Sequence, residues 1–107
     1  MKLSIITVAF NAEATIAEAV ASVIGQKRTG YELEYIIVDG ASADGTVAAL
    51  EPYRSGIAHI ISEPDSGLYD AMNKGIAAAT GDVIGILNAD DTYAHDGVLA
   101  AVAKRFG

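Results

Sequence analysis

Four short apolar runs, separated by helical patterns, are the feature that most constrains the fold of this chain. They read LSIITV (3–8), YIIV (35–38), AHII (58–61) and VIGIL (83–87), and they do not alternate between apolar and polar residues. Strands that are buried on both faces give such runs, as in a parallel sheet covered by helices. The strand-then-helix order, with right-handed crossovers, predicts an open, doubly wound, mainly parallel α/β sheet.

The helical patterns lie in residues 12–26, 44–54, 66–80 and from 96 onward. The first begins with a capping-box spacing between Thr15 and Glu18, although Asn11 is an equally good cap. Pro52 disturbs the second pattern near its end. The last two patterns predict one buried stripe each, formed by Leu68, Met72, Ile76 and Ala79 in the third and by Leu99, Val102 and Phe106 in the fourth.

Length and charge exclude several classes of protein. A chain of 107 residues suffices for one compact domain, and without cysteine it has neither disulfides nor a thiolate metal site. The net charge of −7 argues against a nucleic-acid binder, which needs a basic face. No secretion signal is recognisable, and no apolar run approaches the roughly 20 residues of a membrane span.

Polar and acidic residues follow every expected strand. In open α/β sheets, ligands bind beyond the carboxyl ends of the strands, so these residues predict a ligand site along one rim of the sheet. The residues are Phe10 to Glu13 after the first strand, Asp39 after the second, Glu63, Asp65, Tyr69, Asp70, Asn73 and Lys74 after the third, and Asn88 to Asp91 after the fourth.

Asp90 and Asp91 are adjacent carboxylates at the end of an apolar strand. The two negative charges repel each other. A hard divalent cation such as Mg²⁺ or Mn²⁺ would neutralise this repulsion and leave coordination positions open for phosphates. The pair is therefore a candidate binding site for a metal ion that in turn holds a diphosphate. The alternative is that Asp91 only shapes and solvates a turn.

Two further acidic positions allow two interpretations each. Asp39 could accept hydrogen bonds from a nucleobase or a ribose hydroxyl, or it could serve a turn by accepting backbone N–H bonds. Asp70 and Lys74, four positions apart on a helix, could belong to the site or form an exposed salt bridge contributing roughly 0.3–0.5 kcal/mol.

Motifs of several other nucleotide-binding and hydrolytic proteins are absent. The first strand–helix turn, AFNAEAT, has no GxGxxG, and the chain contains neither GxxxxGK[ST] nor GxSxG. A non-enzymatic, Mg²⁺-dependent acidic switch domain of the receiver type remains an alternative, although it places an acidic pair where this chain has FNAE. A plain nucleotide-binding module is the other alternative.

Three stretches together resemble the family 2-like GT-A glycosyltransferases. They are SIITVAFNAEATIAEAVASV from Ser4, YIIVDGASADGT from Tyr35 and SEPDSGLYDAMNKGIAAATGDVIGILNADD from Ser62, of which the last is the most specific. The resemblance implies a GT-A fold with a Rossmann-like nucleotide-binding half. It also implies transfer of a sugar from a nucleotide-diphosphate sugar, often a UDP-sugar, to an acceptor hydroxyl, with inversion and with Mg²⁺ or Mn²⁺.

The resemblance also implies roles for individual residues. Thr7 to Phe10, including Ala9, border the nucleotide, and Asp39 contacts the base. Asp65 and Lys74 lie near the nucleotide or its phosphates. Asn88-Ala89-Asp90 occupies the D-x-D place of the family, so that Asp90 binds the metal, with Asp91 beside it, and Asn88 can still hydrogen-bond a ribose hydroxyl.

The resemblance places the catalytic base in a later part of the domain than these residues. We therefore expect residues 1–107 to be the nucleotide-sugar-binding part of a longer domain, and to be inactive alone; a small complete domain is the alternative. The acceptor could be a glycan or a lipid-linked glycan, as in cell-surface polysaccharide biosynthesis. The nucleotide-sugar pool and the absent signal imply a cytoplasmic or membrane-peripheral protein.

Overall fold

The computed structural model describes residues 1–107 and contains a single four-stranded sheet. The elements are β1 (Lys2–Ala9), α1 (Ile16–Ile24), β2 (Glu32–Asp39), the 3₁₀-helix η1 (Ala48–Gly56), β3 (His59–Ser62), α2 (Leu68–Ala78), β4 (Val83–Ile86) and α3 (Val98–Phe106). All four predicted strands are present, within three residues of their expected ends. No helix is long and apolar enough to cross a bilayer.

The sheet has the order β3-β2-β1-β4, and every neighbouring pair is parallel. β1 and β2 pair along all eight of their residues, whereas β3 and β4 each pair along four. The two long central strands therefore form the rigid middle of the molecule. The predicted doubly wound α/β architecture is confirmed.

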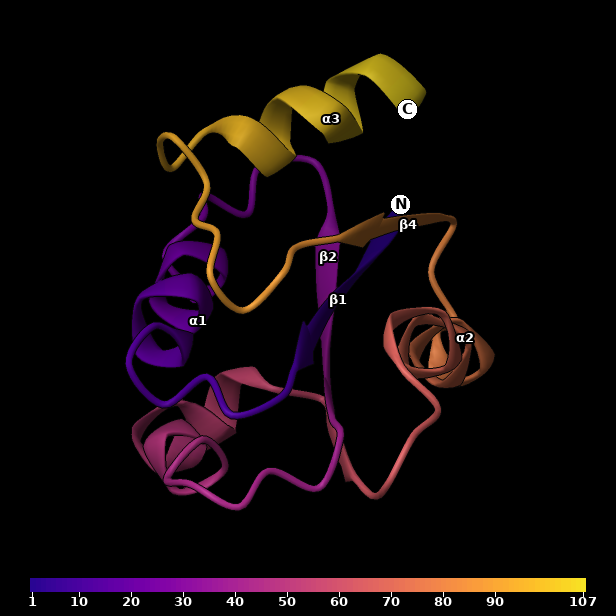
Figure 1. Ribbon diagram of the computed structural model, residues 1–107. Helices are drawn as coiled ribbons and strands as arrows, with labels where there is room; N and C mark the ends of the chain where they lie inside the picture. Colours follow the sequence, from indigo (N-terminus) through magenta and orange to yellow (C-terminus); the bar gives the residue numbers. More distant parts are fainter.

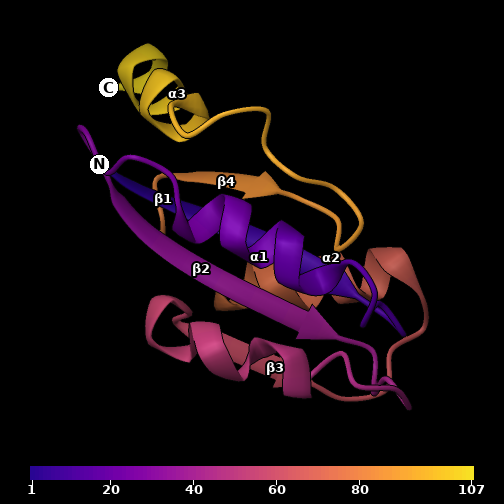
Figure 2. The same cartoon turned by 90° about the vertical axis from the view of Figure 1, so that its left-hand side faces the viewer.

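Helices cover both faces of the sheet. Figure 1 shows α1 and η1 on one side of the strands and α2 on the other, and Figure 2 shows α1 lying across β1 and β2. Side chains alternate between the faces of a strand, which gives two cores. The larger core of 14 buried residues contains side chains of β1, β2, α1, η1 and α3, and the smaller core consists of Ile6, Val8, Ile36, Val38 and Ala71.

The first helix buries the apolar face expected from the spacing of Ile16, Ala19, Val20, Val23 and Ile24, of which Ile24 is only half-buried, but it lacks the predicted cap. Ile16, Ala19, Val20 and Val23 are fully buried, and each such isoleucine or valine contributes roughly 1.5–3 kcal/mol. Thr15 occupies the N-cap position without a side-chain cap hydrogen bond. Asn11 does not cap the helix either, because it has a left-handed φ of 48° and its side chain accepts a hydrogen bond from the Ala43 amide.

The predicted stripe of α2 is correct only for Met72 and Ala79, which are half-buried and pack against the smaller core. Leu68 and Ile76 are 52% and 43% exposed, and the buried positions are Ala71 and Gly75. The helix lies so close to β1 that a Cβ on Gly75 would come within 2.6 Å of the Ile6 side chain. Because small residues make this contact, the larger apolar residues are displaced to the flanks of the helix.

The other two helical segments also differ in detail from expectation. The segment around Pro52 forms a 3₁₀-helix that includes the proline, and not the expected α-helix. In α3, Leu99 is buried as predicted, but Ala103 is the second buried residue and Phe106 is 62% exposed. The last part of the predicted α3 stripe is therefore wrong.

Candidate functional site

A cavity of about 680 Å³ lies at the carboxyl ends of β1, β2 and β4. This is the edge of the sheet at which the sequence predicts a ligand site, and the volume is in the range of pockets for nucleotide-sized ligands. Half of the 14 lining residues are hydrophobic. The lining consists of Val8, Ala9, Phe10, Asn11, Ala12, Thr15, Gly40, Asp65, Gly67, Leu68, Ala71, Asn88, Ala89 and Asp90.

One wall of the cavity is made by the loop after β1, which is hydrogen-bonded to the loop after β2. The loop after β1 (residues 10–15) and the loop after β2 (residues 40–47) exchange five hydrogen bonds that involve side chains. They run from the Asn11 amide to Ser42 Oγ (2.7 Å), from the Ala43 amide to Asn11 Oδ1 (2.9 Å), from the Ala12 amide to Thr46 Oγ1 (2.8 Å), from the Gly45 amide to Glu13 Oε2 (3.0 Å) and from the Glu13 amide to Asp44 Oδ2 (3.3 Å). We call this set the loop zipper.

Asp39 lies directly behind this wall and is completely buried. Its carboxylate accepts hydrogen bonds from the Ser42 amide (3.0 Å), Ser42 Oγ (2.5 Å) and Ser62 Oγ (2.8 Å). The neighbouring residue, Gly40, lines the cavity. The turn interpretation of Asp39 thus matches its observed contacts, and Asp39 is not among the residues that line the cavity.

Asp65 reaches the cavity from the loop after β3. Its Oδ1 accepts a hydrogen bond from the Gly67 amide at 3.1 Å. A Cβ on Gly40 would lie 2.9 Å from Asp65 Oδ2, so a glycine is what lets this carboxylate approach the end of β2. Gly67, with a φ of 114°, supplies the left-handed turn from which α2 begins.

Asn88, Ala89 and Asp90 reach the cavity because the chain continues alongside β1 after β4 ends. The amide of Ala89 donates to the Val8 carbonyl at 3.2 Å, and the amide of Asp91 closes a turn onto the Asn88 carbonyl at 3.0 Å. Asp90 is exposed and faces the cavity, whereas Asp91 is exposed but outside the lining. Neither carboxylate is joined to another side chain by a hydrogen bond or ion pair.

The donor set fits a divalent cation only in part. Nowhere does the structure gather three or more His, Cys, Asp or Glu side chains in a group able to hold a metal ion. Mg²⁺, however, is commonly bound by one or two carboxylates plus the phosphates of a substrate. The Asp90 carboxylate and the Asn88 amide oxygen, both on the cavity, therefore fit a cation that is held jointly with a ligand.

Besides Asp39 and Asp91, two more of the predicted site residues do not line the cavity. Thr7 is completely buried, and its hydroxyl lies 2.7 Å from the Tyr35 hydroxyl, whose pKa burial raises. The ammonium of Lys74 donates to the Pro64 carbonyl at 2.8 Å and pairs with Glu63 (3.2 Å) and Asp70 (3.7 Å). The salt-bridge interpretation of the Asp70–Lys74 spacing is therefore the one observed.

The surroundings of Lys74 explain why it holds a proton tightly. Partial burial works against the charged ammonium, but the carboxylates of Glu63 and Asp70 outweigh it and raise the pKa of Lys74. With its three donor directions committed to the loop before α2, Lys74 holds the segment that carries Asp65.

The structure brings six predicted residues together and adds others. Ala9, Phe10, Asp65, Asn88, Ala89 and Asp90 line one cavity. The sequence did not single out Gly67, Leu68 and Ala71 as site residues, although they line the same cavity from the first turn of α2. The glycine before an apolar helical pattern was the available signal, but the expected stripe had assigned Leu68 to the core.

Comparison of the chain with known proteins identifies its family. Residues 4–107 match the family described as "Glycosyl transferase family 2". An uncharacterized glycosyltransferase of Mycobacterium tuberculosis is 42% identical over 102 residues, which cover 95% of this chain and 38% of that protein. The chain thus spans well under half the length of this relative.

Solved structures give the same result. The structure of S. aureus TarS 1-349 in complex with UDP-GlcNAc superposes with a TM-score of 0.83 and 26% identity, over 97% of this chain and 30% of that one. The mannosyltransferase PcManGT from Pyrobaculum calidifontis, in complex with GDP-Man and Mn²⁺, superposes with a TM-score of 0.82 and 28% identity. The match covers 94% of this chain and 31% of that one. With its sheet, its cavity at the strand ends and its sequence all in agreement, this chain belongs to glycosyl transferase family 2.

Proposed function

We propose that this chain forms the donor-binding part of a glycosyltransferase that moves a sugar from a nucleotide-diphosphate sugar to an acceptor hydroxyl. The observation that carries the proposal is the single cavity at the strand ends, bordered by Asp65 and Asp90, in a member of this family. The complexes of similar proteins with UDP-GlcNAc and with GDP-Man and Mn²⁺ support this class of ligand. A UDP-sugar is our first choice.

The nucleotide would lie against the wall that the loop zipper builds. Ala9 and Phe10 would border it, and Asn88 would hydrogen-bond a ribose hydroxyl, with the Ala89 backbone beside it. Asp39 would contact the base after a serine hydroxyl turns away, because a carboxylate can exchange one donor for another. Thr7 and Lys74 are left out of the proposed contacts, since one is buried under Tyr35 and the other is paired within its own loop.

The diphosphate would lie next to Asp90. In a chain with a net charge of −7, a dianionic ligand beside two carboxylates requires a positive partner. We propose Asp90 as the protein ligand of a divalent cation, Mg²⁺ or Mn²⁺, with Asn88 and Asp91 beside it. When bound, the cation would stabilise the negative charge of the departing diphosphate.

The proposed chemistry is a direct displacement with inversion. The acceptor oxygen forms a bond to the anomeric carbon while the bond from that carbon to the diphosphate oxygen breaks, and a base removes the hydroxyl proton. Because we propose that Asp65 lies near the nucleotide or its phosphates and that Asp90 binds the cation, we propose that the base lies in the part of the longer relatives that this chain does not span. The 107 residues alone should then bind donor but transfer no sugar in an assay with a labelled UDP-sugar.

The proposed donor is made in the cytoplasm, so we place the reaction there or at the membrane surface facing it. Two non-catalytic functions, a receiver-like switch and a plain nucleotide-binding module, predict different behaviour. A receiver-like switch would not bind UDP, and a plain nucleotide module would bind UDP with the same affinity whether or not Mn²⁺ is present.

Calorimetric titration with UDP, with and without Mn²⁺, tests the proposal. We expect Mn²⁺ to strengthen UDP binding, Asp90→Ala to abolish that enhancement, and Asp39→Ala to weaken binding with and without metal. Glu32→Ala is the matched control, because it removes an exposed carboxylate at the opposite end of β2. UDP binding that is tight but indifferent to both Mn²⁺ and Asp90 would contradict the metal role.

A further inference from the structure

The turn that carries Asp90 and Asp91 is anchored by a hydrogen bond at each end, and in both bonds the donor is a main-chain amide. On one side the Ala89 amide is bound to the Val8 carbonyl at 3.2 Å. On the other side the Tyr93 amide donates to Ser22 Oγ at 3.2 Å. Between these anchors neither carboxylate has a side-chain partner, so the position of both depends on how firmly the following segment is held.

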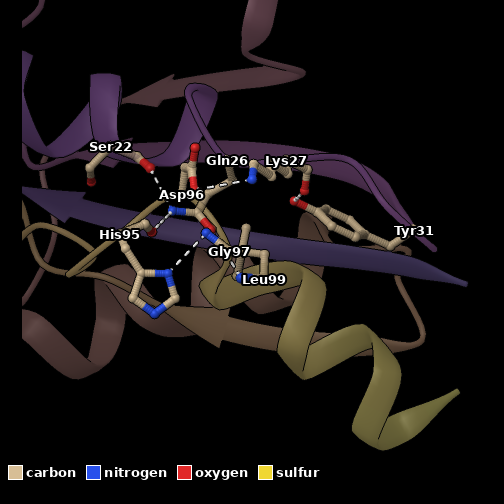
Figure 3. A network of polar contacts seen from close by, with 8 residues as sticks. All are labelled: Ser22, Gln26, Lys27, Tyr31, His95, Asp96, Gly97 and Leu99. Carbon is tan, nitrogen blue, oxygen red and sulfur yellow. Dashed lines mark hydrogen bonds and ion pairs between the residues drawn. The ribbon is translucent and has the colours of Figure 1, made fainter.

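Gln26, two residues beyond the end of α1, holds that following segment. Its side-chain amide donates to the His95 carbonyl at 2.6 Å, and its Oε1 accepts a hydrogen bond from the Leu99 amide at 3.0 Å (Figure 3). The residue is only 5% exposed. One side chain therefore joins both ends of the segment His95–Leu99 to α1.

The contact with Leu99 also starts α3. The N-cap residue of this helix, Gly97, provides no side-chain cap hydrogen bond, and Leu99 is in the first turn, where amides lack helical partners. Gln26 supplies the missing acceptor from a distant part of the chain. The backbone of Lys27 adds a further bond, because its amide donates to the Asp96 carbonyl at 2.8 Å, and its own carbonyl accepts from the Tyr31 hydroxyl at 2.6 Å.

We infer that Gln26 is a positioning residue for the acidic turn, defined as residues 88–92, and through it for the proposed donor and metal site. This inference rests on the proposed function. It follows from the bonding pattern: with Gln26 removed, the hydrogen bonds that still join Tyr93–Leu99 to the end of α1 are those of Ser22 and Lys27, beside the packing of Tyr93 and Leu99 against the larger core. The turn is then held less firmly on that side. Residues that hydrogen-bond directly to metal ligands typically change metal affinity 10- to 100-fold when they are lost, and for Gln26, which acts through the backbone of residues 93–99, we expect the lower end of that range.

Gln26→Met tests the inference, because methionine keeps the length of the side chain and removes its hydrogen bonds to His95, to Leu99 and to the Ser22 carbonyl. Gln26→Glu is the partial variant, since its carboxylate can still accept from the Leu99 amide but cannot donate to the His95 carbonyl. The matched stability control is Glu34→Gln, which breaks a buried network with Ser4 and Thr80 at the start of β2, away from the cavity.

Two measurements on the 107-residue chain decide the matter. The first is calorimetry with UDP, with and without Mn²⁺, on variants shown by circular dichroism to be folded. For Gln26→Met we expect the Mn²⁺ enhancement of UDP binding to fall by roughly tenfold or more, and the UDP affinity without metal to stay within about twofold of the parent. For Gln26→Glu we expect an enhancement between those of the parent and Gln26→Met. Glu34→Gln should keep the full enhancement.

The second measurement is amide hydrogen exchange without any ligand. In Gln26→Met the amides of Ala89, Asp91 and Tyr93 should exchange about five- to tenfold faster, as expected for the loss of one hydrogen bond, and in Glu34→Gln they should not. Unchanged exchange at these amides, or an undiminished Mn²⁺ enhancement in folded Gln26→Met, overturns the inference. If the parent chain binds no UDP while the turn still loosens, the proposed function fails and the positioning of the turn stands.

Discussion

Asp39 and Asp90 are both carboxylates at strand ends, but the structure surrounds them differently. Asp39 is fully buried and accepts three hydrogen bonds from two serines, whereas Asp90 is exposed on the cavity without a polar partner. A carboxylate that already accepts hydrogen bonds from the protein stabilises a loop. A carboxylate without a protein partner is available to a ligand. The sequence could predict that both lie at the rim, but not which of them was already bound by neighbours.

Glu34 is a third kind of carboxylate, buried at the opposite end of β2. It accepts hydrogen bonds from the Thr80 amide (2.8 Å), from Ser4 Oγ (2.7 Å) and from Thr80 Oγ1 (2.8 Å). The bond from the Thr80 backbone, with the two hydroxyls, outweighs burial and lowers the pKa of Glu34 to about 2. Nothing in the sequence pattern distinguished this residue.

The Glu34 network predicts a defined pH dependence of stability. Because the pKa is lower in the folded chain than the ordinary 4.5, the stabilisation is complete above pH 4.5 and is lost as the pH falls toward 2. Glu34→Gln should lower the free energy of unfolding at pH 7 by roughly 1–2 kcal/mol. Urea titrations of both proteins should show the difference shrinking between pH 4.5 and pH 2. A difference that is constant with pH would contradict the assignment to ionised Glu34.

At the scale of elements, α2 shows what periodicity can and cannot predict. The existence and the limits of the helix were predictable from SGLYDAMNKGIAAAT, but its buried face was not. The spacing of large apolar residues assumes that burial follows side-chain size. Here the distance between helix and sheet is set by Ala71 and Gly75, and only the packed structure reveals that the close approach excludes the larger side chains.

Gly75→Ala should therefore destabilise the chain although alanine is the better helix former. The added methyl would lie 2.6 Å from Ile6 Cγ2, in the centre of the smaller core. Overpacking costs roughly 1–3 kcal/mol, which exceeds the helix-propensity gain of about 1 kcal/mol.

Thermal or urea unfolding measures this effect. Asn73→Ala, at an exposed position of the same helix, is the control and should leave stability unchanged or raise it by less than about 1 kcal/mol. If Gly75→Ala were more stable than the parent, the helix would not be as close to β1 as described.

At the scale of the whole molecule, the two faces of the sheet are unequal. The face covered by α1, η1 and α3 buries a cluster of 14 apolar residues, and the face covered by α2 buries five. β4 adds to the asymmetry, because it pairs along only four residues and leaves Ile84 and Ile86 about 40% exposed. The sequence predicted the order of the elements, but unequal burial depends on distances between them that a pattern does not contain.

This asymmetry predicts a sequence of local unfolding events. Amides of β1, β2 and α1 should exchange most slowly, near the rate set by global unfolding, because they belong to the larger core. Amides of α2 and β4 should exchange faster, because fewer buried contacts hold them. Native-state hydrogen exchange at low denaturant concentrations checks this, and equal protection of α1 and α2 would show that the chain opens as one unit.

The loop zipper constrains how the lengths of two distant segments can change. Its five bonds join residues 11–13 to residues 42–46 in a crossed order, since Ala12 pairs with Thr46 whereas Glu13 pairs with Asp44 and Gly45, and each bond joins a main-chain amide to a side chain. Inserting or deleting one residue within either set would separate several donors from their acceptors. The two segments can therefore vary in length only by coordinated change, which sets a limit on which loop grafts between members of this family will leave the cavity wall intact.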